Sequence, residues 1–253
     1  MNNPCQRPDK KINRSSLFLV LILATLLGAC KTPQAPSPSG PSPTPLPTLA
    51  LVPTVPAVQV TPTGDPATYL ALGKAHQEAG ETAQAIAALE AAVFLAPDLL
   101  EARFYLGNAY TAAGRPADAE AQFQAVLQAD PDHLSAHSNL GVVYLQMERV
   151  ENAQAEFQAA LALDEADAEV HYLLGVTHVR LGQLEEGRAE FEQAIALNPE
   201  LPESYFGLGT VYRLTEDKEK AIEAYETFLS KGPAQDPAAE EEARRILAVL
   251  KGE

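Results

Sequence analysis

From residue 66 onwards, apolar residues recur at helical spacing in two successive sets that a short break separates. Residues three and four apart share one face of a helix, so each set predicts one amphipathic helix. Gly80 stands in the break, where a left-handed residue lets one helix end and an antiparallel one begin. The pattern therefore predicts a helical hairpin. Its first helix carries Tyr69, Leu72, Gly73 and His76, and its second carries Ala85, Leu89 and Ala92.

This hairpin pattern repeats with a fixed period of 34 residues. A fixed period of this size marks stacked repeats, in which one unit cannot bury its apolar face alone and packs on its neighbours. The sequence thus predicts an all-α solenoid of tandem helical hairpins. The marker of the period is a Leu-Gly pair, at Leu72-Gly73, Leu106-Gly107, Leu140-Gly141, Leu174-Gly175 and Leu208-Gly209.

The boundaries of the helices have signals of their own. Asp65-Pro66 offers an N-cap followed by a proline in the first turn. Glu148 and Glu216 stand where the turn glycine would be, so we expect looser turns there. After the repeats, one further apolar stripe predicts a capping helix with a charged outer face. Prolines end the second helix at Pro97, Pro131, Pro199 and Pro233, and the stripe consists of Ala243, Ile246, Leu247 and Leu250.

The unit resembles the tetratricopeptide repeat, a helix-turn-helix unit of the same length. In the second unit, Leu106, Gly107, Tyr110, Ala119, Phe123 and Pro131 occupy the characteristic positions of that family. The resemblance implies a right-handed α-solenoid that binds other proteins. It divides the folded part into five units, 66–99, 100–133, 134–167, 168–201 and 202–235, followed by the capping helix at 236–253.

In this family, the first helices of the units line a concave groove that binds partners. Asn108 and Asn139 match two asparagines that hold an extended peptide in members with a carboxylate clamp, but the basic residues of that clamp are missing here. We therefore expect a segment with apolar anchors rather than a C-terminal carboxylate. The alternative is that the aromatic residues only pack between units. The resemblance places in the groove Phe104, Tyr105, Asn108, Ser138, Asn139, Val142, Tyr172, Leu173, Val176, Arg180, Phe206 and Arg213.

Residues 1–30 have the order of a secretory signal, with a basic segment before an apolar run from Leu17 to Leu27. The run is shorter than the ~20 residues that a membrane-spanning helix needs. It ends in Leu27-Gly28-Ala29-Cys30, which resembles the lipobox of bacterial lipoproteins. That resemblance implies removal of residues 1–29 and acylation of Cys30, with several acyl chains as the membrane anchor. An ordinary signal peptide with a chance cysteine is the alternative.

The segment from Lys31 to Asp65 contains ten prolines among serine and threonine residues. Proline removes backbone donors and favours the extended polyproline conformation, so residues 30–65 are predicted to be a disordered linker behind the lipidated cysteine. Such a spacer separates the folded part from the membrane. A proline-rich ligand for a partner is the alternative, and the serine and threonine content also permits glycosylation.

Charge and cysteine usage exclude several classes of function. The formal net charge is −16, and loss of residues 1–29, with four basic residues and one acidic, changes it to −19. Such a surface repels nucleic acid and anionic head groups, so no nucleic-acid partner is expected. Cys5 lies in the removed segment, which leaves no free thiol after lipidation of Cys30. His133, His137 and His171 are the candidate zinc ligands, but packing histidines are the favoured interpretation.

Motifs for a nucleophile, a phosphate-binding loop or a metalloprotease are missing from the sequence, so neither an enzyme nor a cofactor is predicted. The hypothesis is a membrane-anchored scaffold that binds a protein or peptide segment in assembly or maintenance of the cell envelope. It would lie on the extracytoplasmic side, at the plasma membrane or the outer membrane. A self-associating structural protein, a homo-oligomer without a separate client, is the alternative, and an enzyme with an unrecognised site is the third.

Overall fold

A computed structural model of the protein describes residues 62–231 and 237–253. The predicted signal, Cys30 and most of the predicted linker lie outside these residues. Within the described ranges every regular element is an α-helix, which confirms the predicted fold class. The helices are α2 (Pro66–Glu78), α3 (Thr82–Leu95), α4 (Leu100–Ala112), α5 (Pro116–Ala129), α6 (Leu134–Gln146), α7 (Val150–Leu163), α8 (Ala168–Arg180), α9 (Leu184–Leu197), α10 (Pro202–Leu214), α11 (Lys218–Ser230) and α12 (Pro237–Lys251).

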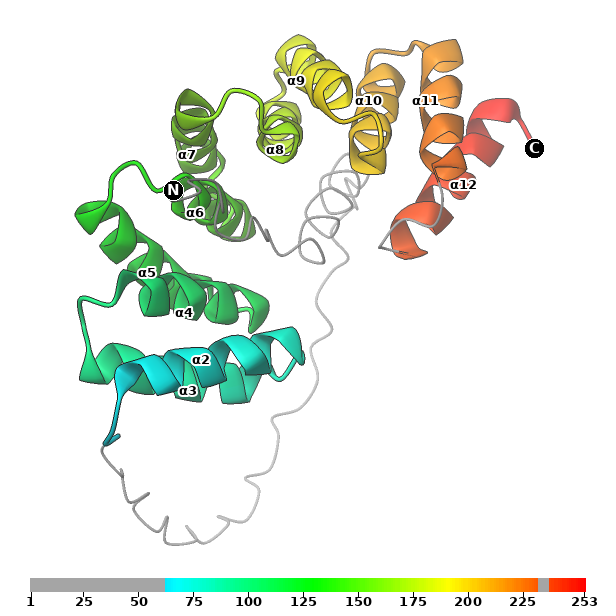
Figure 1. Ribbon diagram of the computed structural model, residues 1–253. Coiled ribbons are helices and arrows are strands. Elements are labelled where there is room, and N and C mark those ends of the chain that lie inside the picture. Colours follow the sequence, from blue (N-terminus) through cyan, green and yellow to red (C-terminus); the bar gives the residue numbers. More distant parts are fainter. Residues whose placement is uncertain (1–61, 232–236) are drawn as a thin grey trace, which may run out of the picture.

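The helices pair in sequence order into five hairpins, from α2 with α3 to α10 with α11, and α12 packs on α11. Each second helix also packs against the first helix of the next hairpin. Successive hairpins follow an arc, with α6 and α8 nearer its inside than α7 and α9 (Figure 1). Neighbouring first helices touch one another along the array. The array is thus a curved solenoid whose first helices lie together.

The Leu-Gly marker has a packing reason in each unit. A Cβ atom added to Gly141 would lie 2.6 Å from Cε1 of Phe157, which is closer than real carbon contacts. The ring of Phe157 is fully buried against this bare stretch of α6. Gly107 meets Phe123 in the same way at 2.7 Å. Glycine therefore lets the two helices of a hairpin approach closely enough for the aromatic ring to fill the space between them.

The turns inside the hairpins share one backbone conformation. Gly114 has a φ of 68°, and Glu148 and Glu216 have φ values of 58° and 62° at the equivalent positions. The amide of Arg149 donates to the carbonyl of Tyr144 at 2.9 Å, the same closing bond that the glycine turns make. The expectation of looser turns at the two glutamates is therefore wrong. The turn has the same geometry, and each glutamate adopts a left-handed backbone conformation, which is unfavourable for residues with a Cβ atom.

The C-terminal end of the array is covered as predicted. Ala243, Ile246 and Leu247 of α12 are buried, and Lys251 forms an ion pair with Glu226 of α11 at 2.8 Å. The opposite face of α12 carries charged residues. This helix therefore closes the apolar side of α11 with a polar exterior.

The N-terminal end differs. Leu72 of α2 is 46% exposed, whereas Leu106, Leu140 and Leu174 at the same position are at most 3% exposed. The helices of the later leucines pack against the second helix of the preceding unit, and α2 has no such helix before it among the described residues. In the described ranges, none of the helices combines the length and the apolar character needed to cross a bilayer.

Candidate functional site

The predicted groove residues differ widely in exposure. Those on α4 are half-buried, whereas most of those on later helices are buried. A partner can therefore reach the α4 side chains without moving the array, but not most of the others. The half-buried set is Phe104, Tyr105, Asn108, Arg180 and Arg213, and the buried set is Ser138, Asn139, Val142, Tyr172, Leu173, Val176 and Phe206.

Two of these residues form a direct bridge between units. Nδ2 of Asn139 on α6 donates to Oδ1 of Asn108 on α4 at 2.7 Å. Asn139 is 7% exposed, so the bond is shielded from water on one side. The amide nitrogen of Asn108 has no partner within the described ranges. Since a side-chain amide carries two donors and an acceptor, this pair retains capacity to bind a peptide backbone.

At the N-terminal side of this bridge, α2 and α4 are joined by polar contacts. Lys74 donates to Glu101 at 2.9 Å, and its ammonium group lies 4.7 Å from the ring centroid of Tyr105. The hydrogen bond to Glu101 raises the pKa of the Lys74 ammonium group, and the negative charge of Glu101 acts in the same direction. Nε2 of Gln77 donates to the backbone carbonyl of Tyr105 at 2.9 Å. The ring of Tyr105 is therefore held in place from the side of α2.

The α6–α8 junction is held by Arg180. Its guanidinium donates to the carbonyl of Leu145 at 3.2 Å and pairs with Glu148. The side chain of Arg180 is only 7% exposed. The positive charge of Arg180 therefore lies between two units, at the C-terminal end of α6. There it stabilises the carbonyl groups that have no partner within that helix.

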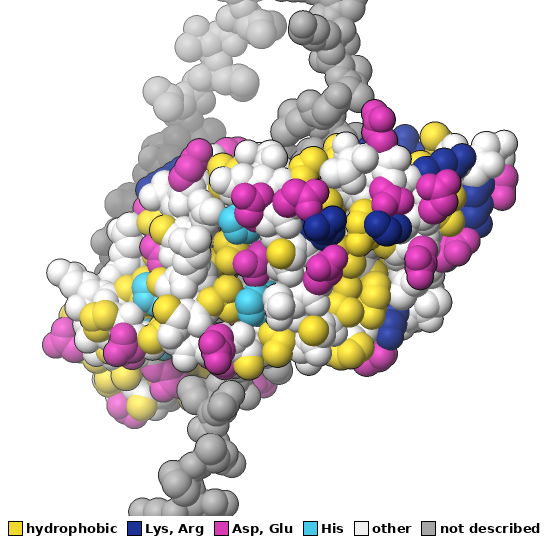
Figure 2. Space-filling view, turned by 90° about the horizontal axis from the view of Figure 1, so that it is seen from above, with side chains coloured by type: hydrophobic (Ala, Val, Ile, Leu, Met, Phe, Trp, Pro, Cys, Tyr) yellow, Lys and Arg dark blue, Asp and Glu magenta, His cyan; other side chains and the backbone are white. Residues whose placement is uncertain are grey.

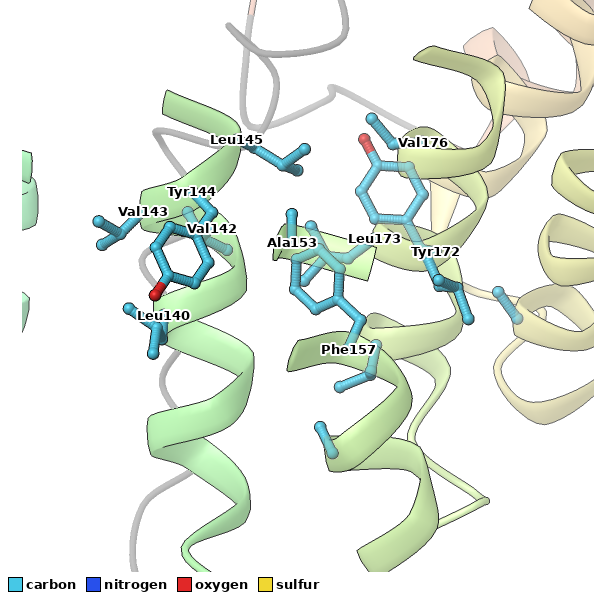
Figure 3. Close-up of a cluster of buried hydrophobic side chains, with 14 of the residues drawn as sticks. Leu140, Val142, Val143, Tyr144, Leu145, Ala153, Phe157, Tyr172, Leu173 and Val176 are labelled. Atoms are coloured by element: carbon cyan, nitrogen blue, oxygen red, sulfur yellow. The ribbon is translucent and has the colours of Figure 1, made fainter. Parts of the chain in front are cut away.

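Tyr172 is the most unusual predicted residue. Its ring is 3% exposed and lies 6.0 Å from that of Phe191, and its hydroxyl has no hydrogen-bond partner within residues 62–231 and 237–253. Figure 3 shows the hydroxyl directed toward the level of Val176 on α8. Burial, with a smaller effect of the charge on Glu203, raises the pKa of Tyr172. A buried hydroxyl without a partner is costly, so an acceptor that reaches it would relieve that cost.

Phe206 belongs to the core of its unit. It is fully buried, and its ring meets those of Tyr225 and Phe228, each with centroids 5.3 Å apart. Phe104 lies differently, since its half-buried ring stacks on His133 at 5.1 Å and meets Phe123 at 6.0 Å. Among the predicted groove residues, the aromatic surface open to a partner therefore lies on α4.

The histidines form a contact that sequence reasoning missed. Nε2 of His137 donates to the carbonyl of Pro131 at 2.9 Å, and Nδ1 lies 2.6 Å from Oε2 of Glu156. His171 makes the same two contacts one unit later. In every unit this position donates to the carbonyl six residues earlier, a feature we name the entry contact. Its donors are Tyr69, Arg103, His137, His171 and Tyr205.

The period was the signal that could have revealed the entry contact, because its five donors lie 34 residues apart and all carry a polar tip. The ring of His133 has a separate use, since its Nδ1 accepts from the amide of Ala136 at the start of α6. Within the part of the chain that the structure describes, His, Cys, Asp and Glu side chains form no group of three or more able to hold a metal ion.

The face seen in Figure 2 carries dispersed acidic side chains with hydrophobic and histidine side chains between them. The basic groups on it are fewer than the acidic ones, and most lie in the right half of the view. Such a surface attracts cationic rather than anionic partners.

Comparisons with known proteins agree with the arrangement of the helices. Two profiles described as tetratricopeptide repeat match the chain, one at residues 70–133 and 172–240, the other at 110–177 and 144–199. The first of these alone matches more than half of the chain. A comparison with curated protein sequences finds no match.

Several solved structures are similar. MamA from Desulfovibrio magneticus RS-1 is 26% identical with a TM-score of 0.62, over 68% of this chain and 98% of that one. TTC0263, a thermophilic protein of the same repeat class from Thermus thermophilus, is 21% identical with a TM-score of 0.59, over 74% and 100%. YrrB, described as having an unusual peptide-binding site, is 23% identical with a TM-score of 0.57, over 72% and 92%. The latter two similarities concern the fold alone.

Proposed function

The chain belongs to the tetratricopeptide repeat family, and we propose that it is a membrane-anchored scaffold that holds a segment of a partner protein against α4 and α6. Membership of the family makes the array a protein–protein interaction scaffold, of a kind that typically catalyses no reaction. What the proposal adds is the place of binding, the chemistry of the partner and the anchoring.

The observation that carries the place of binding is the bridge between Asn108 and Asn139. It crosses two units on the side where the first helices meet, and the amide nitrogen of Asn108 remains available there. Tyr105, held by Gln77 and Lys74, and half-buried Phe104 supply apolar surface on the same helix. An extended segment recognised by side-chain amides, with an apolar anchor beside it, fits this combination.

The remaining predicted groove residues would act less directly. Ser138, Val142, Leu173 and Val176 are buried and give the α6–α8 part of the surface its shape. The hydroxyl of Tyr172 would become a donor to the partner only after a small displacement of its surroundings, because the oxygen atom is buried. The proposed site is therefore centred on units two and three rather than spread evenly along the array.

The acidic surface sets the charge of the partner. The chain has a formal net charge of −16, and the exposed side chain of Glu101 lies beside Tyr105 through its contact with Lys74. Opposite charges accelerate association and penalise wrong partners. A client segment with apolar residues and net positive charge is therefore favoured.

Anchoring is supported by the sequence alone. Leu27-Gly28-Ala29-Cys30 follows a basic and then apolar segment, and the proline-rich stretch after it provides reach from a membrane surface. The scaffold would then act in the cell envelope, on the extracytoplasmic face of the membrane. Incorporation of radiolabelled palmitate into the wild-type chain, with loss of label in Cys30→Ser, is expected. Equal labelling of the two chains contradicts the anchoring.

The groove is tested by affinity purification from detergent-solubilised native envelopes. We expect partners that are recovered with the wild-type chain to be lost with Asn108→Ala/Asn139→Ala. The matched control is Gln128→Ala/Asn152→Ala, on exposed positions of second helices. Circular dichroism establishes that all three chains have equal helicity.

The outcomes separate the hypotheses. Retention of the same partners by the bridge variant contradicts binding at α4 and α6. Recovery of the protein alone, with a molecular mass that rises with concentration, favours the self-associating structural protein instead.

A further inference from the structure

The exposed surface at the start of the array is a single stripe of α2, which we name the N-terminal face and define as Thr68, Leu72 and Ala75. These residues follow one another at helical spacing and are all exposed. At the equivalent positions of the next unit, Ala102, Leu106 and Ala109 are at most 2% exposed. The same three positions are also covered in the third, fourth and fifth units.

In the later units, the helix that carries these positions packs against the second helix of the unit before. The helices α3, α5, α7 and α9 pack on α4, α6, α8 and α10, respectively. Before α2, the residues one period upstream of α3 are 48–61, which lie outside the described residues. In sequence order, this segment occupies the place before α2 that a second helix occupies before each later first helix.

The composition of that segment is unlike the rest of the proline-rich stretch. Residues 31–45 contain one alanine as their only apolar residue besides proline, whereas residues 49–60 contain eight such residues. Leu51, Val55 and Val58 lie one period upstream of Ala85, Leu89 and Ala92, the fully buried core positions of α3. The segment thus has apolar side chains at the core positions of a second helix.

A regular helix is nevertheless disfavoured there by the sequence. Pro53 and Pro56 would both fall in its interior, and each interior proline costs about 3 kcal/mol. In the polyproline conformation, which has three residues per turn, side chains three apart share one edge. Leu49, Val52, Val55 and Val58 have this spacing and form an unbroken apolar edge. The segment is therefore suited to lie extended with one apolar side.

The dimensions agree with this arrangement. An extended run of ten residues, 49–58, spans roughly 28 Å at ~3.1 Å per residue. Helix α2 has 13 residues and is therefore about 20 Å long. The chain enters α2 with its direction fixed, since Tyr69 donates to the carbonyl of Thr63 at 3.2 Å. A return of the preceding residues along α2 needs only the short connection at 59–65.

A second copy of the array is a poorer cover. Its C-terminal end is closed by α12, whose exposed surface carries Glu241, Arg244 and Arg245. Stacking that charged surface on Leu72 would bury charges against an apolar side chain, which is costly. The upstream segment, by contrast, is tethered next to the face and is present at high effective concentration.

We propose that residues 49–58 form an extended strap whose apolar edge, Leu49, Val52, Val55 and Val58, covers the N-terminal face of α2. The free part of the tether is then the stretch before residue 49. The strap fixes the point at which the tether leaves the array. It completes the core of the first unit, as a second helix does for each later unit.

The test measures the reaction rate of a thiol placed on the face. Ala75→Cys is introduced into the full-length chain together with Cys5→Ser and Cys30→Ser, and labelling with a maleimide is followed in detergent. Val52→Ser/Val55→Ser removes half of the apolar edge. The matched control is Leu51→Ser/Val60→Ser, which removes two apolar side chains from another side of the extended segment.

We expect Val52→Ser/Val55→Ser to accelerate labelling about tenfold, because the strap then opens more readily. The control pair is expected to leave the rate unchanged. A rate that neither pair alters, or that both pairs raise equally, overturns the proposal. Labelling that slows as the protein concentration rises also overturns it, since a second copy would then be the cover.

Discussion

The first and last helices of the array are both end helices, yet within the described residues the apolar stripe of α12 is buried and that of α2 is exposed. On α12, Ile246 and Leu247 face α11 and are at most 8% exposed. On α2, Leu72 is 46% exposed although its counterpart Leu106 is 2% exposed. A leucine at one position of the repeat is thus buried or exposed according to whether another unit precedes it. Burial in this fold is a property of the junction between units rather than of the unit.

Removal of α12 is expected to have the largest effect. Deletion of residues 237–253 withdraws Ile246 and Leu247 from the core, at about 1.5–3 kcal/mol for each side chain, so the free energy of unfolding falls by about 3–6 kcal/mol. Urea denaturation followed by circular dichroism measures this. A loss below about 1 kcal/mol would mean that α11 does not need its cover.

Substitution of the leucine of the Leu-Gly pair compares the stability of an interior unit with that of the first unit. Leu140→Ala is expected to lower the free energy of unfolding by about 2–5 kcal/mol, because Leu140 is 1% exposed. Leu72→Ala is expected to cost less. If the strap covers Leu72, that cost shrinks further by about 0.5 kcal/mol or more in the Val52→Ser/Val55→Ser background. The urea midpoints of the wild type, Leu72→Ala, the strap variant and their combination measure this. Additive effects of Leu72→Ala and the strap variant would mean that the strap does not contact Leu72.

The entry contact offers a smaller comparison. His137→Ala is expected to cost about 1–2 kcal/mol, because the carboxylate of Glu156 and the carbonyl of Pro131 lose their donor. His137→Arg is the control, since Arg103 makes the equivalent bonds to Pro97 and Gln122 one unit earlier. Tyr69→Phe, at the open end, is expected to cost less than His137→Ala because its bond to Thr63 is exposed. Thermal unfolding of the three variants provides the measurement, and equal losses would refute the ranking.

The smallest expected effect is a gain near the covered end. Glu216→Gly relieves a left-handed residue and is expected to raise the free energy of unfolding by about 0.5–1 kcal/mol. Glu148→Gly is expected to gain less, because it also removes the ion pair with Arg180. A destabilised Glu216→Gly chain in urea denaturation would show that the side chain contributes more than the strain costs.

Much of the fold follows from the sequence because the period repeats both the apolar pattern and the turn signal. The pairing of Gly141 with Phe157 is visible in the spacing alone once the hairpin is recognised. The turns at Glu148 and Glu216 were not predictable, since propensity favours glycine there and the surrounding helices impose the left-handed backbone. Propensity is a local quantity, and in this case the packing of both helices overrides it.

The groove was less predictable than the fold. Position within the repeat correctly identifies which residues lie on first helices, but it does not tell how closely neighbouring first helices approach. Phe206 and Leu173 are fully or almost fully buried, while Phe104 and Tyr105 at related positions are half-buried. The difference depends on neighbouring side chains, such as the two rings that enclose Phe206. The role of these residues in binding stays a prediction.

Residues that form hydrogen bonds between units are close in sequence, and this has a consequence for the folding rate. Hydrogen bonds between neighbouring units join residues 20 to 35 positions apart, as between Tyr110 and Glu90 or Arg180 and Leu145. Contacts of such short sequence separation form quickly, because little loop entropy is lost before they close. Folding can therefore begin at any hairpin and spread, and opening should start at the terminal helices, which have a neighbouring unit on one side only. Amide hydrogen exchange should then run as a gradient, fastest in the terminal helices and slowest in the central hairpins.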